Sequence, residues 1–149
     1  MKVKDIMNTS VKTAKPNTPV RDLVEVMCFN KISGMPVVDD NNNVVGVVSE
    51  KDVLRKMFPD ISEVAREEGV PDFEKMEKGY SDALGLKASD LMSKLVASAS
   101  PEMPLMKAVS IMCVQKIRRI PVVEAGKLVG IISLGDVHKA IFANSLKGA

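Results

Sequence analysis

Apolar residues along the chain follow two spacings that predict different elements. After Thr18-Pro19 they recur at i, i+3, i+4, i+7 and i+8, the spacing of one helix face, and this set is Val20, Leu23, Val24, Met27 and Cys28. Thr18 is the expected N-cap, because proline suits the first position of a helix. Two continuous apolar runs follow, Met35–Val38 and Val44–Val48, and the polar turn between them indicates a hairpin. Ser49 is expected to open a further helix that runs towards Phe58.

This pattern occurs twice. A shift of 85 positions superimposes Asp5 on Asp90, and beyond the polar turn a shift of 84 superimposes the phrase GVVSEKDVL, which begins at Gly46, on GIISLGDVH, which begins at Gly130. The chain is therefore a duplicated unit of about fifty-five residues, which is longer than common solenoid periods. One copy is predicted over 1–58 and the other over 88–149, each with the order strand, helix, strand, strand, helix. The predicted fold class is α+β.

Residues 59–87, between the two copies, do not belong to the repeat. They are rich in glutamate and lysine and are interrupted by glycines and prolines. Apolar residues nevertheless recur, which favours one or two short amphipathic helices over a disordered linker. The expected packing residues are Val64, Phe73, Met76 and Tyr80. The charged residues are interpreted as a solvated face.

Composition excludes several classes of protein. Charged residues make up 27% of the chain and nearly balance, with a formal net charge of +2, whereas a nucleic-acid binder usually shows a strong basic excess. Aromatic residues, which stack on bases, are only 3%. Residues 1–7 are charged and lack the apolar stretch of a signal peptide, and the apolar runs are too short to cross a bilayer. We therefore expect a cytoplasmic protein with no nucleic-acid partner and no membrane partner.

The residues needed for catalysis are also missing from the sequence. There is no P-loop, no G-x-G-x-x-G and no evident nucleophile–base pair, and His138 is the only histidine. A metal site needs several ligands, so we expect no metal, no catalytic cofactor and no enzyme activity. Cys28 and Cys113 stand at matching positions of the two predicted helix faces. They are interpreted as buried free thiols, which suits a reducing compartment.

The repeated phrase places Ser-x-x-Asp at the start of a predicted helix in both copies, as Ser49/Asp52 and Ser133/Asp136. One interpretation is structural, because such a pair caps a helix. The other is functional. A helix start offers free N–H groups to a phosphate, and a carboxylate beside it can accept hydrogen bonds from both hydroxyls of a ribose. Both interpretations remain open on these residues alone.

Two copies of this order, each with a proline-bearing strand (GMPVV and RIPVV) and a closing G-h-h-S-x-x-D, resemble a tandem pair of CBS domains, also called a Bateman module. The resemblance covers about residues 2–55 and 88–143. It implies two βαββα motifs packed with pseudo-twofold symmetry around two clefts. Clefts of this family commonly bind AMP, ADP, ATP or S-adenosylmethionine. The resemblance therefore implies a non-catalytic regulatory module that senses an adenosyl ligand.

The resemblance also implies which residues line each cleft, since the Ser and Asp of one copy face the first-strand approach and the residues around the strand proline of the other copy. The cleft of Ser133 and Asp136 would be lined by Thr9, Val11, Thr13, Ile32, Ser33, Gly34, Met35 and Pro36. The cleft of Ser49 and Asp52 would be lined by Lys94, Val96, Ser98, Ile117, Arg118, Arg119, Ile120 and Pro121. Taken singly, the valines and isoleucines are better explained as core residues. His138 and Lys139 are interpreted as ordinary helix residues or, alternatively, as phosphate or ribose contacts.

The two clefts are expected to be unequal. The implied wall of the Asp136 cleft contains the small pair Ser33-Gly34, whereas that of the Asp52 cleft contains Arg118-Arg119. A glycine lets a planar ring approach the backbone closely, so the Asp136 cleft is predicted to be the main site. The alternative is that the arginines bind phosphates and favour the Asp52 cleft.

The predicted helix faces also bear on assembly. The apolar helix faces behind Pro19 and Pro104 would be partly uncovered in units this small, and CBS pairs commonly dimerise through such faces, so a homodimer is expected. The regulated protein cannot be named from the sequence. The alternative function is an interaction and dimerisation adaptor whose ligand clefts are degenerate.

Overall fold

A computed structural model of the chain describes residues 1–56, 73–95 and 97–148. Three residues for which the sequence made predictions lie outside these ranges: Phe58, Val64 and Val96. The chain forms two compact units, and neither is a continuous segment. Unit 1 contains Met1–Val11, Asp40–Val44 and Leu95–Ala149, and unit 2 contains Lys12–Asp39 and Val45–Lys94. The opening residues of each repeat therefore belong to the unit that holds the strands and helices of the other repeat.

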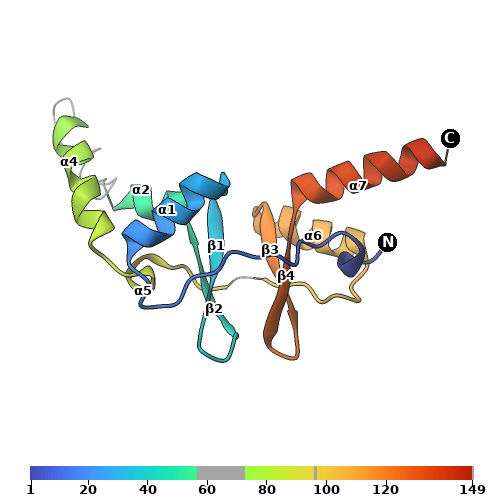
Figure 1. Ribbon diagram of the computed structural model, residues 1–149. Coiled ribbons are helices and arrows are strands. Elements are labelled where there is room, and N and C mark those ends of the chain that lie inside the picture. Colours follow the sequence, from blue (N-terminus) through green and yellow to red (C-terminus); the bar gives the residue numbers. More distant parts are fainter. Residues whose placement is uncertain (57–72, 96, 149) are drawn as a thin grey trace. The chain divides into compact units, whose positions relative to one another are not determined.

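Unit 2 is built on a two-stranded sheet of β1 (Gly34–Val38) and β2 (Val44–Ser49), of which Val44 itself belongs to unit 1. Helix α1 (Val20–Asn30) precedes the sheet and α2 (Glu50–Arg55) follows it. Helix α4 (Phe73–Leu84) packs against α1 and α2 (Figure 1), and the single-turn α5 (Ala88–Leu91) follows it. The core of this unit consists of Ala14, Val20, Leu23, Met27, Met35, Val37, Val48, Val53, Ala88 and Leu91.

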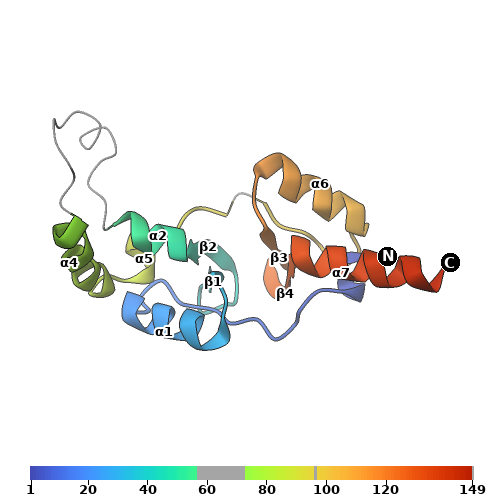
Figure 2. The same ribbon diagram turned by 90° about the horizontal axis from the view of Figure 1, so that it is seen from above.

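Unit 1 repeats this plan with β3 (Arg119–Glu124) and β4 (Lys127–Ser133), an antiparallel pair. Helix α6 (Leu105–Gln115) precedes the sheet, and α7 (Leu134–Lys147) follows it and contacts both α6 and β4 (Figure 2). The short 3-10 helix η1 (Val3–Asp5) comes from the opening segment of the chain. The core consists of Val3, Ala99, Leu105, Ala108, Met112, Ile120, Val122, Ile132 and Val137. The α+β class, the hairpins and the two repeated motifs are thus confirmed.

The opening strand expected in each copy is only a single bridge. Ala14 pairs in parallel with Val37, and Ala99 pairs in parallel with Val122. Each alanine exchanges two backbone hydrogen bonds with the strand beside it, as in Ala14 N to Pro36 O (3.0 Å) and Val38 N to Ala14 O (2.8 Å). A proline follows two residues later in both copies, and because proline has no N–H to donate, the pairing ends there.

The N-cap expected at Thr18 is wrong by one residue. Pro19 is the N-cap, with an extended backbone (φ −60°, ψ 140°), and the Thr18 hydroxyl instead accepts a hydrogen bond from Lys15 N at 2.9 Å. The first helical amide, Val20 N, donates to Leu86 O at 2.8 Å. In α6 the first amide, Leu105 N, donates to Met1 O at 3.0 Å. Chain segments far away in the sequence therefore take the place of a side-chain cap.

The predicted helix faces are narrower than their spacing indicated. In α1 the positions Val20, Leu23 and Met27 are buried, but Val24 is only half-buried and Cys28 is exposed. Cys113 in α6 is exposed as well, so the expectation that both free thiols are buried is wrong. Each sheet has only two strands and therefore covers a narrow stripe of the helix, the i, i+3 and i+7 positions. The i+4 and i+8 positions lie further around the helix and point away from the sheet.

The described part of the insertion is a helix, as predicted. Tyr80 and Leu84 of α4 pack on the core of unit 2, and Met76 is half-buried. Phe73, expected to pack, is 63% exposed because it is the first residue of the helix and lies at its outer end.

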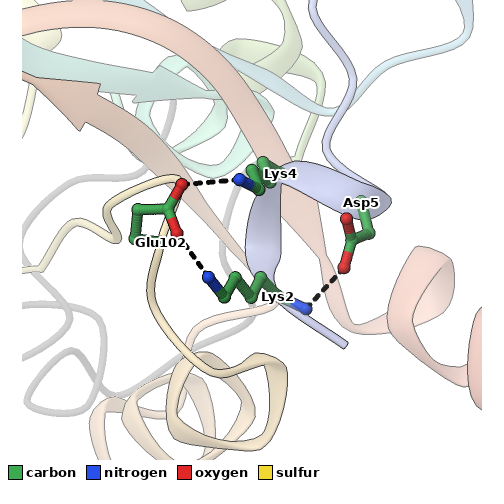
Figure 3. A network of polar contacts seen from close by, with 4 residues as sticks. All are labelled: Lys2, Lys4, Asp5 and Glu102. Atoms are coloured by element: carbon green, nitrogen blue, oxygen red, sulfur yellow. Dashed lines mark hydrogen bonds and ion pairs between the residues drawn. The ribbon is translucent and has the colours of Figure 1, made fainter.

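The N-terminal segment is fastened to unit 1 by both packing and charge. Val3 is fully buried and its N–H donates to Met103 O at 2.9 Å. Glu102 accepts hydrogen bonds from Lys2 Nζ at 2.6 Å and from Lys4 Nζ at 2.7 Å, and Lys2 N donates to Asp5 Oδ2 at 2.7 Å (Figure 3). The hydrogen bonds from the two lysines lower the pKa of Glu102 from 4.5 to about 2.

Candidate functional site

In each unit the opening segment of one repeat pairs with the strand that leads to the Ser-x-x-Asp helix of the other repeat. In unit 1, Asn8 and Ile131 exchange two backbone hydrogen bonds of 2.9 Å. In unit 2, Val47 and Ser93 exchange bonds of 3.0 and 2.9 Å. Ile131 and Val47 lie two residues before the candidate serines of their strands. The structure therefore brings the Thr9 side of the chain towards Ser133, and the Lys94 side towards Ser49.

Glycines of the repeated phrase make this pairing close. A Cβ added at Gly130 would lie 2.9 Å from Met7 Sδ and 3.0 Å from Asn8 O. A Cβ added at Gly46 would lie 2.9 Å from both Met92 Sδ and Ser93 O. Real Cβ atoms are almost never closer than 3.0 Å to a neighbour, so a side chain at Gly46 would force the backbone at Ser93 to shift. At Gly130 the Met7 side chain would have to move and the Asn8 carbonyl to give way slightly. The absence of a side chain at Gly46 and Gly130 thus lets the segment from the other repeat lie close to the strand that leads to the candidate residues.

Ser133 and Asp136 lie at the start of α7. Ser133 is the N-cap and its hydroxyl accepts a hydrogen bond from Asp136 N at 3.1 Å. Asp136 is exposed, and among residues 1–56, 73–95 and 97–148 the structure gives its carboxylate oxygens no hydrogen-bond partner. A carboxylate in this state can accept hydrogen bonds from two hydroxyl groups without breaking an internal bond.

Ser49 and Asp52 have the same spacing but a different hydrogen-bond pattern. Asp52 Oδ2 accepts from Ser49 N at 2.9 Å and from Ser49 Oγ at 3.1 Å. Its other oxygen, Oδ1, accepts from Ser93 Oγ at 3.3 Å. Asp52 is half-buried. Both oxygens of this carboxylate are therefore engaged within unit 2, and the pair forms the capping arrangement that one of the two interpretations predicted.

The residues before each proline strand lie beside the serine of their own copy. A Cβ at Gly34 would lie 3.3 Å from Ser49 Cα, and Glu50 N donates to Ser33 O at 2.9 Å. The same positions of the second copy bring Arg119 opposite Ser133 in the ladder, and Leu134 N donates to Arg118 O at 2.8 Å. The arginine pair is thus next to the Asp136 helix. The predicted difference between the two clefts requires the residues before the proline strand of one copy to lie beside the Ser-x-x-Asp pair of the other copy. That arrangement stays a prediction.

The remaining candidates differ in accessibility. Met35, Pro36, Ile120 and Pro121 are buried strand residues, and Val11, Ile32 and Ile117 are half-buried. Thr9, Thr13, Lys94, Ser98, Arg118, His138 and Lys139 are exposed. The buried members therefore contribute to the core, and only the second group and the half-buried side chains offer surface to a ligand.

Two residues of this region are not among those predicted, Asn8 and Ser93. They occupy matching positions of the repeat, immediately before Thr9 and Lys94. The repeat could have pointed to these positions, but it could not have shown that a serine hydroxyl there reaches Asp52. Within the described ranges, the structure shows no group of three or more His, Cys, Asp or Glu residues that could hold a metal ion. None of the helices described is long and apolar enough to cross a membrane.

Comparison with known proteins identifies the class. The model of the CBS domain family matches residues 3–59 and 88–143. The chain belongs to this family and carries two CBS motifs in tandem.

Individual relatives agree with this assignment. The chain is 33% identical over 144 residues to the chloroplastic CBS domain-containing protein CBSX2 of Arabidopsis thaliana, covering 88% of this chain and 58% of the relative. It is 30% identical over 155 residues to the uncharacterized protein MJ1426 of Methanocaldococcus jannaschii, covering 95% and 91% of the two chains. The crystal structure of CBSX2 in complex with AMP matches with a TM-score of 0.74 at 33% identity, covering 97% of this chain and 98% of that chain.

Proposed function

We propose that this protein is a non-catalytic regulatory module that binds an adenosyl ligand, AMP, ADP, ATP or S-adenosylmethionine, and that Asp136 accepts the ribose hydroxyls. The observation that carries the proposal is the exposed Asp136 carboxylate at the start of α7, which has no hydrogen-bond partner among the described residues. Asp52, in contrast, is engaged by Ser49 and Ser93. The AMP complex of the relative CBSX2 supports the class of ligand.

Other groups near α7 suit the rest of such a ligand. Leu134 N and Asp136 N at the start of this fourteen-residue helix are engaged by Arg118 O and Ser133 Oγ, so it is the positive end of the helix dipole that favours a phosphate. Exposed His138 and Lys139 lie one turn or less beyond Asp136 and offer further donors. Arg118, which lies beside Leu134 in the same unit, adds a guanidinium suited to phosphate. We propose Thr9 and Val11, which follow the segment paired with β4, as the adenine side of the site.

The first experiment screens the purified protein with AMP, ADP, ATP, NAD and S-adenosylmethionine by thermal shift. A ligand present at one hundred times its Kd adds about 2.7 kcal/mol to the free energy of unfolding. A rise in Tm with at least one adenosyl ligand is expected. A folded protein whose Tm responds to none of them would favour the alternative function, an interaction adaptor with degenerate clefts.

The second experiment assigns the site. Calorimetric titration of Asp136→Ala should lose most of the binding, because hydrogen bonds to a charged acceptor contribute about 1.5–3 kcal/mol each. Asp52→Ala should weaken binding less. Loss of binding in Asp52→Ala with retention in Asp136→Ala would reverse the ranking of the two sites.

The proposed absence of catalysis is tested separately. Incubation with ATP or S-adenosylmethionine should return the ligand unchanged when it is analysed by chromatography. Turnover that survives repurification and disappears in Asp136→Ala or Asp52→Ala would overturn the non-catalytic proposal. We further propose that the module acts as a homodimer on a regulated protein that has yet to be identified.

A further inference from the structure

Asp52 and Asp136 occupy matching positions of the two repeats, but their carboxylates have different hydrogen-bond partners. Asp52 is engaged through both oxygens, whereas Asp136 has no carboxylate partner in the described part of the chain. The capping serines account for one oxygen: Ser49 N and Oγ donate to Asp52 Oδ2, whereas the Ser133 hydroxyl accepts from Asp136 N. They do not account for the second oxygen, Asp52 Oδ1, which has a donor outside the capping pair.

The backbone of the crossing segment is also the same in both units. Ser93 is held opposite Val47, and Asn8 opposite Ile131, each by two backbone hydrogen bonds between 2.9 and 3.0 Å. The methionine before each residue packs on the glycine of the repeated phrase, with Sδ 2.9 Å from the position of a Cβ. The crossing segment therefore holds the same backbone position beside the strand that leads to each Ser-x-x-Asp helix.

The side chain at that position differs between the two units. Ser93 Oγ donates to Asp52 Oδ1 at 3.3 Å. Asn8 Oδ1 instead accepts a hydrogen bond from Ser10 N at 2.9 Å, so the Asn8 side chain is held against the backbone two residues further along the chain. A hydroxyl is thus supplied to Asp52 where no corresponding donor reaches Asp136.

We infer that Ser93 is a specificity-determining residue that occupies the Asp52 carboxylate in the manner of a ribose hydroxyl, and that Asn8 leaves Asp136 available to the ligand. This inference rests on the proposed function and deepens it, because it names the residues that decide which of the two aspartates takes the ribose. A ribose that binds both oxygens of Asp52 competes with Ser49 at Oδ2 and with the Ser93 hydroxyl at Oδ1. A ribose at Asp136 competes with no donor of the described residues.

The test compares calorimetric titrations of AMP, or of whichever nucleotide the thermal screen selects, into three proteins. The wild type is expected to bind one equivalent per chain at the Asp136 site. Ser93→Ala should raise the affinity of the Asp52 site about three- to tenfold, since the long hydrogen bond of 3.3 Å from the Ser93 hydroxyl no longer competes, and move the stoichiometry towards two. The added binding should disappear in the double variant Ser93→Ala/Asp52→Asn.

Three further variants control the test. Ser89→Ala removes an exposed serine of the same unit, and its titration should match that of the wild type. Asn8→Ser places a hydroxyl opposite Asp136 and should weaken AMP binding about three- to tenfold. It is compared with Asn8→Ala, which loses the same bond to Ser10 without supplying a hydroxyl.

The outcomes separate this inference from the proposed function. If the wild type binds AMP, but Ser93→Ala keeps the wild-type stoichiometry and affinity and Asn8→Ser equals Asn8→Ala, the inference is overturned while the proposed function stands. Two equally tight equivalents in the wild type, one of them lost in Asp52→Asn, would also overturn it. If no adenosyl ligand binds to any of these folded proteins, the proposed function fails and the inference fails with it.

Discussion

Glu102 shows how much a single exposed side chain contributes to the position of the opening segment. Its two oxygens accept from Lys2 and Lys4, which lie on either side of the buried Val3. The side chains of all three charged residues are between 46% and 62% exposed. Such surface pairs are weak because water and salt screen them. Burial of Val3 therefore holds the segment in place, and the ion pairs of Glu102 add a smaller, pH-dependent contribution to the free energy of unfolding.

The sign of this pH dependence follows from the pKa of Glu102, which is lowered from 4.5 to about 2 in the folded chain. Between these values the unfolded state binds the proton more readily, so folding loses stability as the pH falls. We expect wild type to have a higher Tm than Glu102→Gln above about pH 4.5, with the difference vanishing towards pH 2. Thermal unfolding followed by circular dichroism across this range measures it.

Controls for this prediction use salt and a second glutamate. High salt should shrink the Tm difference at neutral pH, because both lysines are exposed. Glu124→Gln removes an exposed carboxylate for which the described residues show no ion pair, and its Tm difference should not follow this pH window. A Tm difference for Glu102→Gln that is constant from pH 7 to pH 2 would contradict the assignment.

At the scale of elements, each repeat is completed by a segment of the other one. Strand β4 is contacted by Met7 and Asn8, and β2 is contacted by Met92 and Ser93. The contact is possible only because the strand residue is glycine, where an added Cβ would meet a backbone carbonyl at 3.0 Å or less. The glycine of the repeated phrase is therefore a packing requirement of the crossing segment.

Gly130→Ala should consequently destabilise the fold by about 1–3 kcal/mol, the usual cost of forcing an extra methyl into a close contact. Urea denaturation gives this free energy directly. Gly135→Ala is the matched control: its Cβ would have no neighbour nearer than 3.8 Å, and inside α7 alanine is better than glycine by about 0.5–1 kcal/mol. Equal stabilities of the two variants would show that Met7 and Asn8 are not held against β4 in solution.

Sequence patterning predicted the elements well because periodicity reports which side chains are buried. The hairpins, helices and the Ser-x-x-Asp positions all follow from it. Periodicity could not predict that Pro19 is the N-cap, because Leu86 accepts the first helical N–H. It also could not predict the exposure of Cys28, which depends on the width of a two-stranded sheet, or the hydrogen bond from Ser93 to Asp52. Each depends on a partner distant in sequence or on a rotamer, and neither leaves a local periodic signal.

At the scale of the whole molecule, both units leave apolar side chains in water. On α6, Met106 is 58% and Val114 76% exposed, and on α7, Phe142 is 59% and Leu146 63% exposed. Phe29 at the end of α1 is 81% exposed. Monomeric proteins seldom leave many large apolar residues on adjoining helices uncovered. These residues lie outside the helix faces behind Pro19 and Pro104 expected from the sequence to mediate dimerisation, because those faces are mostly buried in the two cores. A dimer interface is therefore expected on the exposed sides of the helices instead.

We expect a homodimer at micromolar concentration, with twice the chain mass of 16.1 kDa by light scattering. Val114→Glu/Phe142→Glu should shift the protein to monomer by at least about tenfold in Kd, because each carboxylate would lose hydration on burial in the interface. Gln115→Glu adds a charge at the exposed last residue of the same helix and should leave the mass unchanged. A wild-type mass of one chain would contradict dimerisation. If the double variant remains a folded dimer, the interface lies elsewhere, and Phe29→Glu then tests the α1 face.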